Sequence, residues 1–327
     1  MVENNEVMLR GIYDALVADE DIKLLIFLGD IQHYTPRDLG EISKWMDWFK
    51  QFGELMLTRT PVNLKVLERE GEPNPNFKYP VFSLRGNHDS TVKNKQEIDF
   101  TFFDMLTKNG LLQNPKGLVF NDGPQLVYYD FRNYGDAYQE LPETIDHRYK
   151  VISLFHDVLT HEYSPAWVKM ALETVKTYDA PKCLLGVDFG IVGHVHDPED
   201  IVEVVTTDQD STPLWQIGSM GRTSVGGSNF RDVGYSVIVD TSDSVLDVNL
   251  LEIPVIPAND YFDFSTRLVN DNKKVAYKNF NLKMDELEIS QRNIYDDIKA
   301  AEVDQIVKDA ALSILKRVDD QAEEEKI

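Results

Sequence analysis

Four short motifs in the sequence each place a side chain that can bind a metal ion directly after an apolar run. They are GD at 29–30, GNHD at 86–89, FHD at 155–157 and GHVH at 193–196. Carboxylate, amide and imidazole groups of this kind suit Mn²⁺, Fe²⁺ or Zn²⁺. Glycine lets the backbone turn sharply after a strand, and strand ends converge at one edge of an α/β sheet. The motifs therefore predict one shared site for divalent metal ions.

The chemistry that such a site supports is hydrolysis of a phosphoester. Two cations about 3.5–4 Å apart can hold both the attacking and the leaving oxygen of an in-line displacement at phosphorus. A histidine whose pKa lies near neutrality can protonate the departing oxygen. Each motif alone has a commoner structural explanation, such as a strand-end aspartate that caps a helix. All four in one chain favour a phosphoesterase-type metal site.

The order of these motifs resembles that of the calcineurin-like metallophosphoesterases, over about residues 7–255. Within that superfamily the chain is most similar to the SbcD-like nuclease subunits of DNA recombination and repair. The features that carry this narrower similarity are GSMGRTS at 218–224, the later strands, a short basic segment and a helical tail. The resemblance implies a hydrolase that cleaves DNA phosphodiester bonds as an exonuclease. It also implies two divalent metal ions as cofactors, with Mn²⁺ favoured.

The resemblance also implies which side chains bind the two metals. Asp30 matches the aspartate that bridges them. Asn87, His156 and His194 match ligands of the second metal, and His196 matches a ligand of the first.

Other roles that the resemblance implies concern the substrate. His88 matches the histidine that contacts the scissile phosphate and protonates the leaving group, and Asp89 would orient it. Arg222, in the GSMGRTS segment, is a candidate phosphate contact, although a surface arginine without a role is an equal alternative. For His33, a loop histidine near the site is the favoured interpretation.

One part of the family pattern is absent from the sequence. Members open with a strand that ends in Asp-x-His and supplies two further ligands to the first metal, and no Asp-x-His precedes Asp30 here. Only Asp30 and His196 would then bind the first metal, so we expect that ion to be weakly bound or absent. The sheet would also lack a central strand. The chain is then either a fragment of a longer or split gene product or a degenerate member.

The elements that must position the motifs follow from hydrophobic patterning. Helical spacing predicts helices at 7–17, 39–57 and 165–177, and Pro, Asn and Glu predict a loop at 67–80. Apolar runs predict strands at 24–30, 81–84, 125–130, 150–155, 189–196, 201–207, 213–218, 235–240 and 245–253. This order predicts an α/β fold in which two mixed sheets pack face to face and are flanked by helices.

The C-terminal part differs from the rest. We expect a metallophosphoesterase domain at 1–255, a small basic segment at 256–283 and an acidic helical tail at 284–327. Within the tail, 303–318 has an apolar stripe at helical spacing. The stripe either packs on its own domain or docks on a partner, which by resemblance is a coiled-coil SbcC-like ATPase.

Composition limits the remaining possibilities. The chain has 327 residues, 33 basic and 56 acidic, for a net charge of −23. Most of such a surface repels polyanions, which disfavours non-specific binding of DNA through a general basic coat. There is no membrane-length apolar run and only one cysteine, Cys183, which together favour a cytoplasmic setting. A phosphoesterase acting on a small substrate, a non-catalytic partner-binding subunit and a homodimer stay open as alternatives.

Overall fold

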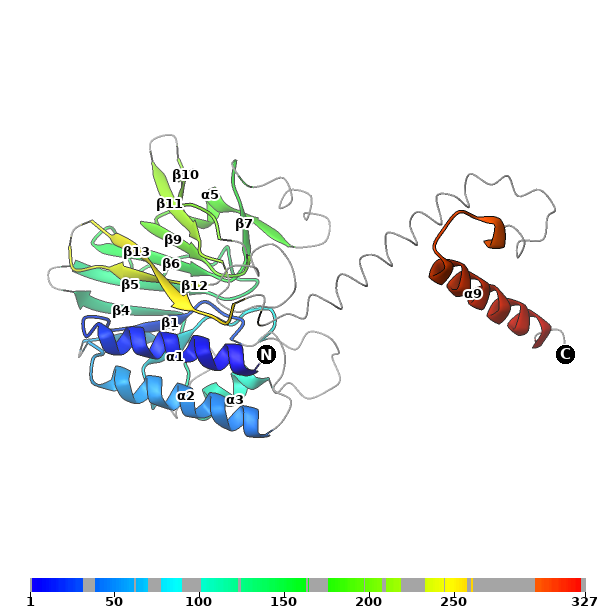
Figure 1. Cartoon of the computed structure of the whole chain (residues 1–327). Helices are drawn as coiled ribbons and strands as arrows, with labels where there is room; N and C mark the ends of the chain where they lie inside the picture. The colour runs from blue at the N-terminus through cyan, green and yellow to red at the C-terminus, as the bar shows by residue number, and fades with distance from the viewer. Residues whose placement is uncertain are drawn as a thin grey trace. The chain divides into compact units, whose positions relative to one another are not determined.

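The computed structural model describes residues 2–31, 39–61, 63–69, 78–89, 101–122, 125–162, 164, 176–196, 198–207, 210–218, 233–243, 245–257, 260 and 298–324. The chain folds as two compact units, Met1–Ala258 and Asn259–Ile327 (Figure 1). The first unit contains every described strand, and the second contains the C-terminal helix.

The helices and strands alternate through the first unit. The helices are α1 (Val2–Ala18), α2 (Leu39–Leu57), α3 (Phe102–Lys108) and α5 (Ala180–Cys183), with α9 (Gln305–Glu324) in the second unit. The strands are β1 (Leu25–Phe27), β2 (Lys65–Leu67), β3 (Val81–Ser83), β4 (Gly117–Asp122), β5 (Gln125–Arg132), β6 (Tyr149–Phe155), β7 (Val158–Thr160), β8 (Thr177–Asp179), β9 (Phe189–Val192), β10 (Val202–Val205), β11 (Ser211–Gln216), β12 (Val233–Asp240) and β13 (Asp247–Pro254).

A seven-stranded mixed sheet forms the centre of the first unit, with strand order β10-β11-β9-β6-β5-β4-β2. Its middle strands β5, β6, β9 and β11 are parallel, while β10, β4 and β2 add antiparallel edges. The remaining strands pair as β1 with β3, β12 with β13 and β7 with β8. The parallel strands bring the carboxyl ends of β6 and β9 to the same edge of the sheet.

The pairs β1–β3 and β12–β13 form a second layer between the large sheet and the helices. Side chains of β1 and β3 alternate between two cores, as strand geometry requires. Val81 packs with α1, α2 and α3, whereas Phe82 packs against the large sheet. Figure 1 shows α1 and α2 side by side along this layer. The fold is thus the predicted α/β sandwich, with its second sheet divided into two separate pairs.

Most predicted elements are confirmed. Helix 39–57 matches α2, helix 7–17 lies within α1, and each of the nine predicted strands overlaps an observed strand. Patterning missed several short elements, including α3, whose capping box is formed by Thr101 and Asp104. Residues 165–175 of the third predicted helix lie outside the described residues, and Thr177 belongs to β8.

The prediction that 24–30 is a buried strand needs one correction. The three residues of β1 are only partly buried, and so are most residues of β12. The reason is a cavity of about 890 Å³ that separates β1 from β12.

The second unit is described only over Ile298–Glu324 and Asp260. Its helix α9 confirms that the predicted segment 303–318 is helical from Gln305 onward. Val307 and Ala311 are buried, whereas Ile306 is 73% exposed and Ile314 is 51% exposed. Among the helices that the structure describes, none is long and apolar enough to cross a membrane.

Candidate metal centre

The site lies where the strands of the two layers end. Asp30 follows β1 and Asn87 follows β3, and these two strands are parallel neighbours. His156 follows β6 and His194 follows β9, which are parallel neighbours in the large sheet. Because the two layers pack face to face, the four strand ends meet at one edge of the sandwich.

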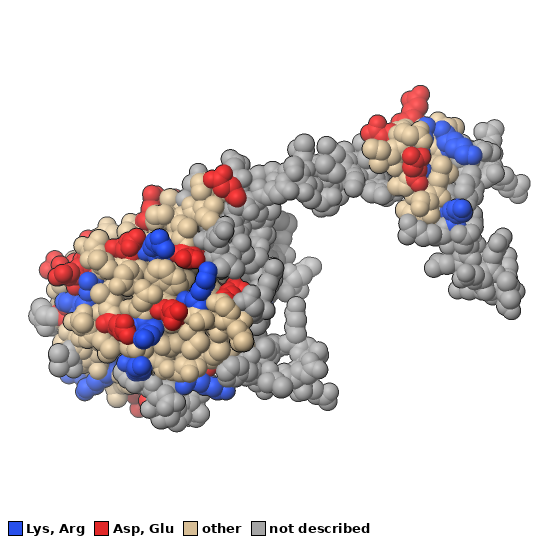
Figure 2. All heavy atoms as spheres, turned by 60° about the horizontal axis from the view of Figure 1, so that its bottom comes forward, with Lys and Arg blue, Asp and Glu red and all other residues tan. Residues whose placement is uncertain are grey.

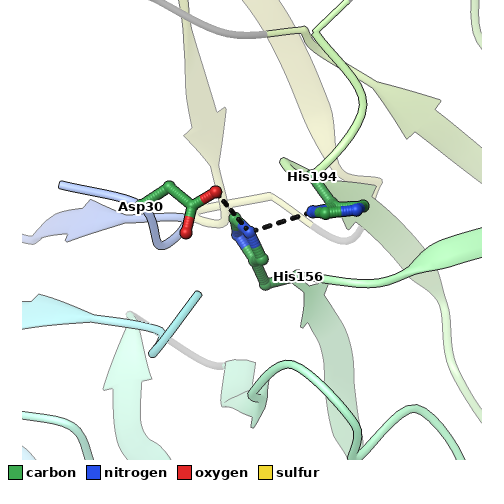
Figure 3. Close-up of side chains that lie close together, drawn as sticks. All are labelled: Asp30, His156 and His194. Atoms are coloured by element: carbon green, nitrogen blue, oxygen red, sulfur yellow. Dashed lines mark hydrogen bonds and ion pairs between the residues drawn. The ribbon is translucent and has the colours of Figure 1, made fainter. Parts of the chain in front are cut away.

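Three of these side chains form a compact cluster around His156 (Figure 3). Its Nε2 atom lies 3.1 Å from Oδ2 of Asp30 and 3.2 Å from Nδ1 of His194. The amide oxygen Oδ1 of Asn87 lies 3.3 Å from the same Nε2 atom. Ligand atoms of Asp30, His156 and His194 all lie within 4.8 Å of one another. Two imidazole nitrogens, a carboxylate oxygen and an amide oxygen therefore converge.

Glycines make room for this convergence. A Cβ atom on Gly86 would lie 2.0 Å from Oδ1 of Asp30, and one on Gly29 would lie 2.4 Å from Nδ1 of His156. Gly29 also has φ +89°, a left-handed conformation that favours glycine. Larger residues at either position would displace a side chain of the cluster.

The backbone of Asp30 is held in an uncommon conformation by the loop after β3. Its φ of +50° is rare for a residue other than glycine. The carboxylate of Asp89 is buried and accepts hydrogen bonds from the backbone N–H of Asp30, at 2.8 Å, and of Gly86, at 2.9 Å. The N–H of His88 donates to Oδ1 of Asp30 at 2.8 Å. The two loops thus fix each other and fix the carboxylate.

The charge states of the cluster follow from burial and pairing. Burial opposes ionisation of Asp30, but the hydrogen bond from His156 outweighs it and lowers the pKa of the carboxyl. For His156, burial is likewise outweighed by Asp30, so its pKa is raised above 6.5. Burial and the positive charge of His156 lower the pKa of His194 to about 4. His194 is therefore neutral at pH 7, as a metal ligand must be.

This donor set fits one divalent metal ion. Carboxylate, amide and imidazole donors suit Mn²⁺ or Zn²⁺, and the glycines leave space around them. Asp30, Asn87, His156 and His194 are the residues predicted from the resemblance for the second metal. The structure brings them together, with the carboxylate of Asp30 accepting a hydrogen bond from Nε2 of His156.

Comparison with known protein families agrees with this geometry. The model of the family described as calcineurin-like phosphoesterase matches residues 5–198, which is more than half of the chain and includes all four motifs. The chain belongs to the calcineurin-like phosphoesterase family. No curated protein matched the sequence significantly.

The other site residues predicted for this phosphoesterase lie outside the cluster or outside the described residues. His88 is exposed on the loop after β3, and Asp89 is 4% exposed beneath it. His196 lies at the end of the cavity between β1 and β12, together with Asp30. Arg222 and His33 lie outside the described residues.

Two features of this phosphoesterase site had no sequence signal. The ring of Tyr134 lies 5.6 Å from that of His194 and is 40% exposed. Asp157 is buried and accepts a hydrogen bond from the N–H of Gly135 at 3.0 Å, and burial raises its pKa to about 6. The first contact joins the loop after β5 to the end of β9 and the second joins it to the end of β6, and no motif could predict either pairing.

Proposed function

We propose that this phosphoesterase is a DNA nuclease of the SbcD-like type, which hydrolyses phosphodiester bonds. Family membership establishes metal-dependent phosphoester hydrolysis as its chemistry. The observation that carries the proposal is the cluster of Asp30, His156 and His194 with the exposed His88 on the adjoining loop. This arrangement supports a reaction at a phosphate that approaches from solvent.

Different residues of the chain would bind the ion and contact the substrate. A divalent ion held by Asp30, Asn87, His156 and His194 would polarise a phosphoryl oxygen and favour ionisation of water. The N–H of His88 bonds to Asp30, so this loop is fixed relative to the ligands. The imidazole of His88 is exposed beside them and could contact the phosphate and protonate the departing oxygen.

The choice of DNA as substrate is supported by the sequence beyond the metal motifs. Residues 267–283 hold five basic residues and one acidic residue, in a chain whose net charge is −23. On the face that Figure 2 presents, described basic and acidic side chains are interspersed and form no continuous basic patch. A general cationic surface is therefore not the means of attraction, and we assign DNA binding to the basic segment.

A second candidate substrate is a small phosphoester, which the acidic overall charge favours. Turnover of bis(p-nitrophenyl) phosphate and of linear duplex DNA, each with Mn²⁺, separates the two. We expect cleavage of DNA, lost in His194→Ala and steeply reduced by salt, because phosphate contacts are salt-dependent. Cleavage of the chromogenic diester alone would exclude the nuclease function and leave phosphoester hydrolysis intact.

We also propose that α9 docks on a coiled-coil ATPase partner. Ile306 and Ile314 are exposed on this helix, while Val307 and Ala311 are buried. An exposed apolar row on an amphipathic helix suits docking in a groove. Ile306→Asp with Ile314→Asp should abolish co-purification with an SbcC-like ATPase, whereas Glu302→Gln should not. Retained co-purification of the double variant would contradict the proposal.

A further inference from the structure

Two exposed tyrosines lie in the loop that follows β5, beside the metal centre. Tyr134 is 40% exposed, and its ring centroid lies 5.6 Å from that of His194. Tyr138 is 52% exposed and lies further along the same loop. A single exposed aromatic residue is ordinary on a protein surface. Two in one loop, with a ring contact to a predicted metal ligand, make this loop a candidate for contact with the substrate.

The backbone around Tyr134 is fixed from two directions. Its N–H donates to the carbonyl oxygen of Arg85 at 2.9 Å, and Arg85 directly precedes the GNHD motif. The N–H of Gly135 donates to both carboxylate oxygens of Asp157, at 3.0 and 3.1 Å. Asp157 is buried and directly follows His156. Tyr134 is therefore anchored both to the GNHD loop and to the end of β6, and a side chain on so fixed a support costs less to order when a ligand binds.

Strand β8 supports the same loop through Tyr178. The hydroxyl of Tyr178 donates to the carbonyl oxygen of Gly135 at 3.1 Å. Its ring packs edge-on against that of Tyr138, with the centroids 5.1 Å apart. The hydroxyl of Tyr138 accepts a hydrogen bond from the N–H of Asp179 at 3.0 Å. Since Tyr178 is buried, it serves as a support and leaves the two exposed tyrosines to meet solvent.

The same patch carries a cation. Lys176 is exposed just before β8, and its Nζ atom lies 4.8 Å from the ring centroid of Tyr178. Hydrogen bonding to Tyr178 raises the pKa of Lys176, and charge interactions with Asp157 and Tyr134 add to this effect. The ammonium group is therefore charged at pH 7 and belongs to the same patch as Tyr134.

Two carboxylates near the patch are already paired with cations. Asp136 lies 3.2 Å from Nη1 of Arg69, and Asp179 lies 3.2 Å from Nζ of Lys182. Pairing of this kind weakens the repulsion that these carboxylates would exert on a phosphate. The patch can thus accept an anion although the chain as a whole is acidic.

Aromatic faces and a cation in one patch suit a single strand of nucleic acid. Every base has a π-face that stacks on an aromatic ring, and lysine contacts the phosphates of the backbone. In a duplex the bases cover one another, so only unpaired bases offer their faces. A small phosphoester needs the metal centre alone, whereas a strand that continues past the cleaved bond extends over the neighbouring surface.

We propose that Tyr134, Tyr138 and Lys176, which we call the tyrosine platform, bind the unpaired nucleotides next to the phosphodiester bond that the metal centre cleaves. Tyr134 stacks on the base nearer to the metal centre, Tyr138 stacks on a base further along, and Lys176 contacts a phosphate of the same strand. The inference rests on the proposed nuclease function and adds its substrate class, DNA with a single-stranded end.

Binding to chelator-treated protein tests the platform without cleavage. The probes are a fluorescently labelled ten-nucleotide oligothymidylate and an abasic phosphodiester of the same length, and fluorescence anisotropy measures their Kd. Tyr134→Ala should weaken binding of the oligothymidylate at least about fivefold and leave binding of the abasic probe unchanged. Tyr134→Leu, which is apolar but cannot stack, should behave like Tyr134→Ala, whereas Tyr134→Phe should behave like the parent.

The lysine has a separate signature. Lys176→Ala should weaken binding of both probes and reduce the slope of log Kd against log salt concentration by about 0.7, because one phosphate contact of a single strand is lost. Lys50→Ala removes an exposed lysine of α2 that is paired with Glu54, and it should leave both the affinity and the slope unchanged.

Three results would overturn the proposal. They are an equal loss of affinity for both probes in Tyr134→Ala, parent-like binding in Tyr134→Leu, and no measurable binding of the oligothymidylate by the parent. Cleavage of the same oligothymidylate with Mn²⁺ is measured separately. A parent that cleaves it while Tyr134→Ala binds it equally well refutes the platform alone. A parent that binds it through Tyr134 but does not cleave it supports the platform and refutes the nuclease function alone.

Discussion

The Nδ1 atom of His156 donates its hydrogen to the backbone carbonyl oxygen of Leu28. A carbonyl oxygen can only accept, so this contact fixes the tautomer and directs the Nε2 atom toward Asp30. Leu28 lies two residues before Asp30 on the same strand extension, so one segment both orients the imidazole and supplies its carboxylate partner. Partners of this kind raise the affinity of a metal site beyond what the ligands alone provide.

The first prediction concerns the ligands themselves. His194→Ala should remove most of the divalent metal that the purified protein retains, because it deletes one of the converging donors. Elemental analysis after dialysis against Mn²⁺ or Zn²⁺ measures this. His147→Ala, an exposed histidine outside the four motifs, is the matched control and should keep the metal. Unchanged occupancy in His194→Ala would show that this histidine is not a ligand.

The second prediction is that metal binding releases a proton. The pKa of His156 is raised above 6.5 by Asp30, whereas the pKa of His194 is lowered to about 4 and that of Asp30 is also lowered. Near pH 6, His156 is thus the one member of the cluster that must lose a proton to bind an ion. Affinity should rise about tenfold per pH unit until the pKa of His156 is passed.

Calorimetry in buffers of different ionisation enthalpy counts the protons released in this titration. About one proton per ion is expected at pH 6 and fewer at pH 9. An affinity that is constant between pH 5.5 and 7 would mean that His156 is not a ligand or is already neutral.

Sequence patterns could predict this cluster because each of its residues stands in a short motif at the end of an apolar run. Asp30, Asn87, His156 and His194 come from four strand ends, and the rule that such ends converge was sufficient to group them. The contact between His156 and the carbonyl of Leu28 could not be predicted, because every residue has a carbonyl group. Tyr134 was missed because its position beside His194 depends on the pairing of β5 with β6 and of β6 with β9.

The fold, like the site, was predictable only where a local sequence pattern is clear. Hydrophobic periodicity predicted α2 with its observed bounds, since 19 residues give a clear stripe. Three-residue strands such as β2 and β7 are too short to show a period. Patterning also could not show that β1 is only partly buried, because the apolar residues of β1 suit a fully covered strand and the cavity beside it arises from tertiary packing.

A third prediction separates substrate handling from metal binding. His88→Ala should leave the metal content unchanged, because the side chain of His88 is exposed and its hydrogen bond to Asp30 is made by the backbone N–H. If the imidazole donates the proton to the leaving group, turnover should fall by roughly 10²–10⁴. Loss of metal from this variant would instead identify His88 as a ligand.

The fourth prediction concerns Asp89, whose pKa burial raises to about 6 from 3.8. Because its folded-state pKa lies above the unfolded value, stability is lost as the pH rises from 3.8 to about 6, and the full penalty remains at higher pH. In chelator-treated protein, Asp89→Asn should therefore be more stable than the parent at pH 8, by up to about 3 kcal/mol. An asparagine oxygen can still accept the hydrogen bonds from the N–H of Asp30 and Gly86.

Denaturant titration at several pH values measures this difference, which should vanish as the pH falls from 6 toward 4. Asp240→Asn serves as the contrast, because hydrogen bonds from Ser242 lower the pKa of that exposed carboxyl and its charge is favourable. A loss of stability in Asp89→Asn at pH 8 would mean that the ionised carboxylate is needed to hold the two loops together.

The last prediction concerns the first metal of the two-metal site implied by the family resemblance. Asp30 and His196 are the two ligands that the resemblance implies for it, and both line the cavity between β1 and β12. Two protein ligands hold a divalent ion weakly, so residues 1–327 should retain about one tightly bound ion per chain and show low turnover.

A strand fused ahead of α1 and ending in Asp-x-His should add a second equivalent of metal and raise turnover by orders of magnitude, because each cation stabilises charge in the displacement. The same strand ending in Ala-x-Ala should give equal protection of β1 and β12 in hydrogen exchange but no second ion. This comparison separates the effect of the added strand from the effect of its metal ligands. Two tightly held ions and full activity in residues 1–327 alone would show that another side chain completes the first site, and His33→Ala would then test the nearest candidate in the sequence.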